Sequence, residues 1–292
     1  LQNFISERIR TELPFEPTEQ QAQLIDRLGE FVVSPEPEKL FLLKGYAGTG
    51  KTSVVSALVR ALNVLEQKTV LLAPTGRAAK VLSGYSGFPA FTIHKKIYRQ
   101  KSMSEFRFQL ADNLHKHTLF IVDEASMISN NGTDGSFGSG RLLDDLIEYV
   151  YGGDECSLLL LGDTAQLPPV EQPQSPALET GALQAYGLKV YEFTLTHVVR
   201  QALESGILYH ATQLRLDLAE DDISQHPKFE LRDFTDISRL SGLDLIDEIQ
   251  RAYNGVGVEN TIVITRSNKR ANMYNNGIRS RVMMKEDELS NG

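Results

Sequence analysis

The residues best suited to chemistry lie in one short stretch, in which glycines precede a lysine and a threonine. Gly45, Gly50, Lys51 and Thr52 fit the phosphate-loop spacing GxxxxGK[ST]. Glycines let backbone N–H groups turn towards an anion, the lysine is a mobile cation for β- and γ-phosphates, and the hydroxyl is a ligand for Mg²⁺. The alternative is a glycine-rich turn with an incidental lysine. The pattern predicts nucleotide contacts from Gly45, Ala47, Gly48, Thr49, Gly50, Lys51, Thr52 and Ser53.

Two further groups of polar residues each follow an apolar run. Asp123 and Glu124 end the run that begins at Leu119, and we expect Asp123 to hold Mg²⁺ and Glu124 to polarise the attacking water. This pair is weak evidence alone and strong evidence after a good phosphate loop. Gln166 follows the run 157–161, where its amide is well placed to sense a γ-phosphate, unless the segment is only a strand-ending turn.

These groups need a scaffold, and the apolar pattern predicts one. Short apolar runs indicate strands at residues 40–43, 69–73, 119–124, 157–161, 191–195 and 260–265, and helices at 53–65, 141–151, 201–219 and 268–282. Such alternation predicts an α/β fold with a parallel sheet flanked by helices. Polar turns at the carboxyl ends of parallel strands meet at one edge, where open α/β sheets bind ligands.

The segment before the first strand contains a helix start at Thr18. Thr18 is a good N-cap, and Gln21 stands at the third helical position of a capping box. The amide of Gln21 could instead read the edge of adenine, which presents a donor and an acceptor. The residues alone favour the capping box.

Composition excludes several classes of protein. The chain has 292 residues, of which 41% are hydrophobic and 23% charged, and no apolar run approaches the length of a membrane span. A single cysteine, Cys156, argues against a disulfide framework, so we expect a cytoplasmic protein. The chain starts at Leu1, from which we expect that its natural N-terminus is missing.

Charge is distributed unevenly along a chain of net charge −8. Residues 75–116 carry eight Lys or Arg and two Asp or Glu, whereas residues 201–250 carry four and eleven. A basic segment on an acidic chain is the pattern expected of a local track for a phosphate backbone, although an uneven solvated surface gives the same counts.

The order of these motifs resembles that of superfamily 1 helicases of the RecD-like, 5′-to-3′ group that includes Dda. The carriers of the resemblance are the segment 18–21, GYAGTGKT, APTGRAA, Thr92-Ile93-His94, VDEASM, GDTAQLPPV, the segment 195–215 and the Asn-rich segment 264–279. GDTAQLPPV is the most specific of these, because kinases and GTPases that share phosphate loops lack it.

The resemblance implies further roles. It implies that ATP and Mg²⁺ are bound, that Gln21 reads adenine, and that Gln166 and Arg200 sense or stabilise the γ-phosphate. It also implies contacts to single-stranded DNA from Thr75, Arg77, His94 and Thr265. We expect a monomer that acts on single-stranded DNA and duplex junctions and has no membrane partner.

The resemblance also predicts the domains. Residues 1–37 would be a helical lead-in, residues 38–200 a first RecA-like domain with a small insertion at about 88–118, and residues 201–292 part of a second RecA-like domain. Helicases of this group carry further motifs, including a second arginine, that have no match before Gly292. We therefore expect a fragment with weak or no activity of its own.

Three alternatives stay open from the sequence. The first is a DNA-dependent ATPase that translocates or remodels protein–DNA complexes without separating strands. The second is an RNA helicase, since the motifs do not distinguish DNA from RNA. The third is a non-catalytic nucleotide-binding module, against which the intact Lys51, Asp123 and Glu124 argue.

Overall fold

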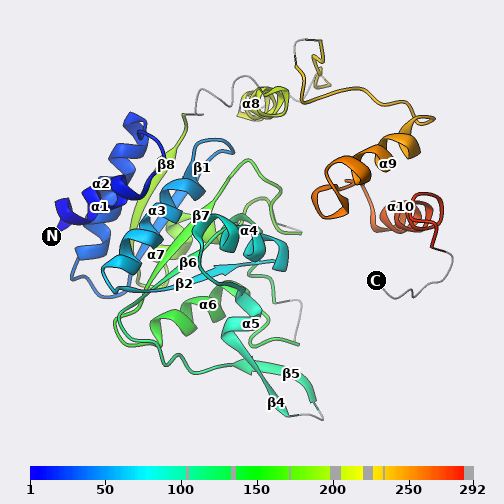
Figure 1. Ribbon diagram of the computed structural model, residues 1–292. Coiled ribbons are helices and arrows are strands. Elements are labelled where there is room, and N and C mark those ends of the chain that lie inside the picture. Colours follow the sequence, from blue (N-terminus) through cyan, green and yellow to red (C-terminus); the bar gives the residue numbers. More distant parts are fainter. Residues whose placement is uncertain are drawn as a thin grey trace. The chain divides into compact units, whose positions relative to one another are not determined.

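Figure 1 shows the computed structural model of the chain, which describes residues 1–102, 105–132, 136–170, 172–197, 205–219, 226–232 and 234–285. The chain divides into two compact units, Leu1–Pro227 and Lys228–Gly292. The sequence predicted a division after residue 200 and a lead-in of residues 1–37. The lead-in belongs to the first unit, where Ile5 and Ile9 are buried in its core.

A six-stranded parallel sheet forms the centre of the first unit (Figure 1). Its strands, in spatial order, are β3 (Ala90–Thr92), β2 (Lys68–Ala73), β6 (Thr118–Val122), β7 (Ser157–Gly162), β1 (Lys39–Gly45) and β8 (Lys189–Leu195). Leu43 of β1 lies opposite Leu161 of β7, and Val122 of β6 lies opposite Leu160. The carboxyl ends of β1, β7 and β6 are therefore neighbours at one edge. The predicted α/β fold is confirmed; β3 was not predicted.

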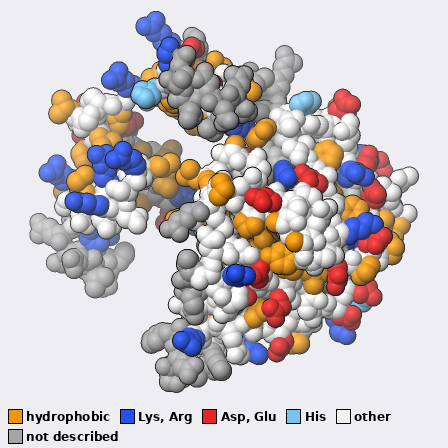
Figure 2. All heavy atoms as spheres, turned by 180° about the vertical axis from the view of Figure 1, so that it is seen from behind, with side chains coloured by type: hydrophobic (Ala, Val, Ile, Leu, Met, Phe, Trp, Pro, Cys, Tyr) orange, Lys and Arg blue, Asp and Glu red, His pale blue; other side chains and the backbone are white. Residues whose placement is uncertain are grey.

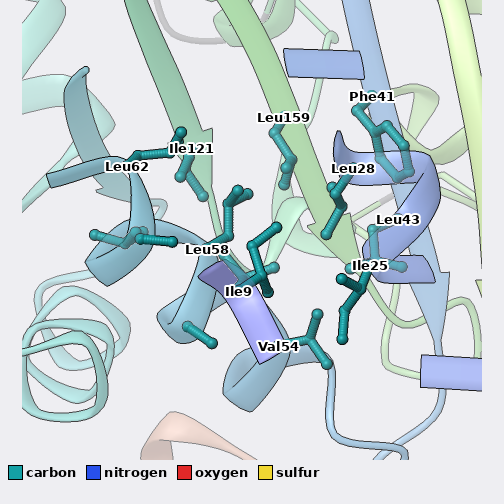
Figure 3. Packing of buried hydrophobic residues seen from close by; sticks show 14 of the residues in the cluster. Ile9, Ile25, Leu28, Phe41, Leu43, Val54, Leu58, Leu62, Ile121 and Leu159 are labelled. Carbon is teal, nitrogen blue, oxygen red and sulfur yellow. The ribbon is translucent and has the colours of Figure 1, made fainter. Parts of the chain in front are cut away.

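Four helices cover one face of the sheet, namely α1 (Gln2–Glu12), α2 (Glu19–Val33), α3 (Lys51–Val64) and α4 (Gly76–Ser86). Phe41 and Leu43 of β1 point to this face because alternate side chains of a strand face opposite ways. Figure 3 shows how these helices pack against the sheet. Ile9 of α1, Ile25 and Leu28 of α2, and Val54, Leu58 and Leu62 of α3 pack against Phe41 and Leu43 of β1, Ile121 of β6 and Leu159 of β7. The phosphate loop thus joins a strand and a helix that are both largely buried in the core.

The opposite face of the sheet receives Leu40 and Leu42 of β1. It is covered by α5 (Ile93–Ile97), α6 (Leu142–Tyr151) and α7 (Thr180–Gln184), together with the short 3₁₀ turns η1 (Ala125–Met127) and η2 (Pro176–Leu178). Because η1 follows the end of β6 directly, its buried Ala125 anchors the chain just beyond the acidic pair.

The predicted insertion contains an antiparallel hairpin of β4 (Tyr98–Ser102) and β5 (Glu105–Leu110). A segment of the Gly- and Ser-rich loop before α6 attaches to it. The N–H of Phe108 donates to the carbonyl of Ser136 at 2.9 Å, the N–H of Gly138 donates to the carbonyl of Phe108 at 2.8 Å, and the rings of Phe108 and Phe137 are stacked 4.7 Å apart. Residues 136–138 therefore brace the hairpin.

The first unit also includes α8 (Gly206–Ala219), which was predicted to begin at residue 201; residues 201–204 lie outside the described part of the chain. The second unit contains α9 (Leu245–Gly255), the 3₁₀ turn η4 (Val258–Asn260) and α10 (Asn268–Arg281). Across all described residues, no helix combines the length and apolarity needed to cross a bilayer.

The strand predicted at residues 260–265 is wrong. This segment forms part of η4 and then an extended stretch with no ladder, in which the side chains of Ile262 and Ile264 are exposed. A strand requires a neighbour for its backbone N–H and C=O groups, and the described residues of the second unit contain no other strand to pair with it. The short apolar run therefore predicted a strand that has no partner strand among the described residues.

Candidate active site

The phosphate loop, residues 46–50, connects the end of β1 to the start of α3. Gly50 is the N-cap of α3 and has a φ of +87°, which a residue with a side chain rarely adopts. A Cβ at Gly50 would also lie only 2.4 Å from Nε2 of Gln21. Two constraints therefore explain the glycine: the positive φ of the turn and the close approach of the Gln21 side chain from α2. The N-terminus of α3 directs the positive end of the helix dipole to this loop.

Lys51 bends back over the loop. Its Nζ donates hydrogen bonds to the carbonyl oxygens of Gly45 and of Tyr46, the latter at 2.9 Å. An ammonium that rests on two neutral carbonyls can exchange them for the stronger, charged oxygens of a phosphate. The geometry of Lys51 therefore fits the phosphate-binding role that the sequence predicted.

Three carboxylates stand near this ammonium. Burial lowers the pKa of Lys51, and the negative charges of Asp163, Asp123 and Glu124 act in the opposite direction. Burial also raises the pKa of Asp123, whose Oδ1 accepts from the N–H of Glu124. The sheet thus brings the predicted cation and the predicted acidic pair together, because β1 and β6 end at the same edge on either side of β7.

Glu124 has a backbone geometry typical of functional positions. Its φ of +57° and ψ of +37° are left-handed, which costs a non-glycine residue about 1–2 kcal/mol. Burial and the neighbouring Asp123 raise the pKa of the Glu124 carboxyl, whereas Lys51 and a hydrogen bond from Gln166 lower it. Gln166 in turn accepts from the hydroxyl of Ser126 at 3.2 Å. The two predicted catalytic residues Glu124 and Gln166 are therefore in contact.

Asp163 is a site residue to which the sequence analysis assigned no role. Its side chain is 4% exposed; Oδ2 accepts from the N–H of Ala47 at 3.0 Å and Oδ1 from the N–H of Ala165 at 2.9 Å. It thus ties the phosphate loop to the turn that carries Gln166. The signal was its position directly after a buried strand, next to the strand that precedes the loop. The N–H of Ala47, predicted to face the nucleotide, is directed at Asp163.

Gln21 forms the predicted capping box. Its Oε1 accepts from the N–H of Thr18 at 3.0 Å, and the hydroxyl of Thr18 accepts from the N–H of Gln21. The other end of the amide donates to the carbonyl of Thr49 in the phosphate loop at 3.0 Å. At 1% exposure, Gln21 therefore joins α2 to the loop, and its contact with adenine stays a prediction.

Gln20, which the sequence did not single out, fastens α2 to the end of β8. Its Oε1 accepts from the N–H groups of Thr196 and His197, both at 3.0 Å, and its Nε2 donates to the hydroxyl of Thr196. Arg200, the predicted γ-phosphate arginine, lies outside the described residues. Its role stays a prediction.

The predicted DNA contacts occupy different elements. Thr75 caps α4, where its hydroxyl accepts from the N–H of Ala78 at 3.2 Å, and Arg77 is exposed in the first turn of that helix. The ring of His94 on α5 lies 5.6 Å from that of Tyr98 and 5.1 Å from that of Phe137. His94 is thus half-buried in an aromatic cluster, whereas Arg77 is open to a ligand.

Thr265 belongs to the second unit, where its hydroxyl donates to the carbonyl of Ser267 at 3.2 Å. Its contact with DNA stays a prediction. Figure 2 shows Lys and Arg side chains among Asp and Glu side chains over the main body of the first unit, so charge on that surface is mixed rather than separated by sign.

The predicted metal ligands are Thr52 and Asp123. Within the described ranges, no cluster of three or more His, Cys, Asp or Glu side chains could hold a metal by itself. One hydroxyl and one half-buried carboxylate beside a phosphate loop fit Mg²⁺, which keeps several waters and shares its shell with the phosphates of a nucleotide. The donors present are therefore compatible with a magnesium ion that binds together with its substrate.

Comparison with known proteins identifies relatives of this arrangement. The model of an AAA domain family (AAA_30) matches residues 18–229, which include the phosphate loop, the acidic pair Asp123 and Glu124, and Gln166, but not Thr265. The ATP-dependent RecD2 DNA helicase of Deinococcus radiodurans is 30% identical over 195 residues, or 66% of this chain and 23% of the relative. The ATP-dependent DNA helicase dda of Enterobacteria phage T4 is 30% identical over 142 residues, or 46% of this chain and 29% of the relative.

Among solved structures, the Pif1 helicase from Candida albicans matches 89% of this chain and 61% of its own, with 17% identity and a TM-score of 0.46. The resemblance to RecD-like and Dda-like proteins that the motifs predicted is confirmed by the family model and these relatives. The chain spans about a quarter of the length of the two curated relatives.

Proposed function

The chain belongs to this AAA domain family, and on that premise we propose that it is an ATP-dependent DNA helicase of 5′-to-3′ polarity. The observation that carries the proposal is the convergence of Lys51, Asp123 and Glu124 at the carboxyl ends of β1 and β6, with Gln166 in contact with Glu124. A cation, a metal-binding carboxylate and a base next to a polar sensor are the parts that hydrolysis of a nucleoside triphosphate requires.

Each of these residues has a separate role in ATP hydrolysis. Lys51 exchanges the carbonyls of Gly45 and Tyr46 for oxygens of the β- and γ-phosphates. Glu124 accepts a proton from the attacking water, and its hydrogen bond with Gln166 makes its position responsive to the γ-phosphate. Thr52 and Asp123 would hold Mg²⁺, which would neutralise charge that develops on the phosphates.

The state of the nucleotide site must also be transmitted to the residues that contact DNA. Thr75 and Arg77 open the helix α4 that follows β2, the neighbour of β6 in the sheet. Because Asp123 donates its N–H to the carbonyl of Leu72 in β2, the acidic pair and this helix start share a direct backbone link. We infer that the phosphate backbone of single-stranded DNA lies over this basic segment and that its position depends on the state of the nucleotide site.

The test is ATP hydrolysis by the complete protein with and without single-stranded DNA. Lys51→Ala should abolish hydrolysis, because it removes the ammonium that contacts both phosphates. Glu124→Gln should keep nucleotide affinity and lose turnover, because it removes the base and leaves the metal ligands. Wild-type turnover in Lys51→Ala would refute the assignment of the site.

A second measurement separates the alternatives. Strand displacement on duplexes with a 5′ or a 3′ single-stranded tail tests unwinding and polarity together. DNA-stimulated hydrolysis without displacement would favour a translocase that remodels protein–DNA complexes, and stimulation by RNA alone would favour an RNA helicase. Nucleotide binding without any hydrolysis would favour a non-catalytic module.

A further inference from the structure

An arginine from a distant element lies over the phosphate loop. The guanidinium carbon of Arg215, in α8, is 4.3 Å from the centre of the Tyr46 ring. Tyr46 directly follows Gly45 at the start of the loop. A guanidinium stacked on an aromatic face is a favourable contact that leaves the N–H groups at its edge available to other partners.

Tyr46 connects this arginine to the catalytic lysine. The carbonyl of Tyr46 accepts from Nζ of Lys51 at 2.9 Å, and the ring of the same residue carries Arg215. The two cations are also close enough to interact: burial is the main cause of the lowered pKa of Lys51, and the positive charge of Arg215 lowers it further. One loop residue therefore holds two cations at the place where phosphates are expected.

The balance of charge makes a second cation useful. Asp123, Glu124 and Asp163 all act on Lys51, so the site holds three carboxylates and a single lysine before Arg215 is counted. A nucleoside triphosphate adds further negative charge to this group. A triphosphate therefore brings more negative charge into the site than a diphosphate does, and even with Mg²⁺ bound a further cation would stabilise it.

A residue of the same helix, α8, also orients the guanidinium of Arg215. Its Nη2 donates to the hydroxyl of Thr212 at 2.6 Å, one turn earlier in α8. Together with the ring of Tyr46, this bond fixes the plane of the guanidinium while the side chain stays half-exposed. An arginine that is held on two sides loses less conformational entropy when it binds a ligand.

We propose that Arg215 is a second phosphate-binding cation of this site, which contacts the terminal phosphate of a nucleoside triphosphate and is held over the loop by Tyr46. The inference rests on the proposed function, since it requires a nucleotide on Lys51. It gives a role to an arginine that had none in the sequence analysis, and it makes α8 part of the site. The competing structural role is a stacking contact that only attaches α8 to the rest of the first unit.

The experiment compares the affinities of ADP and of a non-hydrolysable ATP analogue, measured by competition with a fluorescent ADP. Arg215→Gln should weaken the affinity for the triphosphate analogue by about 10–100-fold, which is the contribution of a hydrogen bond to a charged group. It should leave the affinity for ADP almost unchanged. Tyr46→Leu, which removes the ring, should show the same selective loss. Arg215→Lys, which keeps the charge without the planar stack, should restore part of the preference.

Arg27→Gln is the matched control, because Arg27 is an exposed arginine of α2 whose ion pair is with Glu30 on the same helix. It should change neither affinity by more than about twofold, as expected for a surface substitution. An equal loss of ADP and triphosphate in Arg215→Gln, or no loss, would overturn the inference in favour of the structural role.

Lys51→Ala separates this inference from the proposed function. It should weaken both nucleotides, because the ammonium serves the β- as well as the γ-phosphate. If both nucleotides bind and depend on Lys51 while Arg215→Gln has no selective effect, only the role of Arg215 fails. If neither nucleotide binds the wild-type protein, the proposed function fails and the inference fails with it.

Discussion

Asp163 offers the most direct test of how the site is held together. Its two carboxylate oxygens accept from two backbone N–H groups, that of Ala47 in the phosphate loop and that of Ala165 before Gln166. Asp163→Asn keeps the shape of the side chain but turns one acceptor into an NH₂ group. That group must face a backbone N–H, so one of the two hydrogen bonds is lost and a buried donor has no acceptor.

The size of the effect follows from the burial. A hydrogen bond to a charged group contributes about 1.5–3 kcal/mol, and Asp163 is 4% exposed, so solvent cannot replace the lost partner. We expect the free energy of unfolding of the first unit to fall by about 2 kcal/mol. For a unit of this length, that corresponds to a melting temperature lower by roughly 4–8 °C.

The assay is thermal and urea unfolding of the nucleotide-free protein, followed by circular dichroism. Asp112→Asn is the matched control, because Asp112 is exposed and its only described ion pair is with Arg99 at 3.3 Å. This surface pair contributes about 0–1 kcal/mol, so the control should melt near the wild type. A stability of Asp163→Asn within about 0.5 kcal/mol of the wild type would show that the two backbone bonds do not hold the loop.

Three further outcomes are expected. Burial raises the pKa of Glu124, so its ionisation opposes folding above that pKa; Glu124→Gln should therefore raise the melting temperature at pH 8 and not at pH 4, as a pH series of unfolding curves will show. Arg77→Glu should weaken binding of single-stranded DNA of any sequence and reduce the slope of log affinity against log salt, measured by titration at several salt concentrations; a loss confined to one sequence would contradict a backbone contact. Gly138→Ala should destabilise the first unit by about 1–3 kcal/mol in urea unfolding, because the φ of Gly138 is +47° and the new Cβ would lie 2.1 Å from Oδ2 of Asp145. The Cβ would displace the hydrogen bond that the hydroxyl of Tyr98 donates to that oxygen. Wild-type stability would mean that the hairpin is not braced there.

The sequence by itself determined the features that depend on neighbours along the chain. Thr18 and Gln21 form the predicted capping box, because its two hydrogen bonds join residues only three apart. The strands at the core of the sheet could be predicted because each is an almost continuous apolar run buried on both faces. The spacing of Gly45, Gly50 and Lys51 is likewise a local pattern, and it was sufficient to place the phosphate loop.

The tertiary structure decided which of these local features meet. The bond between Asp163 and Ala47 joins residues 116 apart, and it exists because β7 and β1 are neighbours, which no local pattern indicates. The stack of Arg215 on Tyr46 is of the same kind. The error at residues 260–265 has the same cause: a short apolar run satisfies the local requirement for a strand, but a strand is stable only beside another strand, and pairing is a property of the assembled chain.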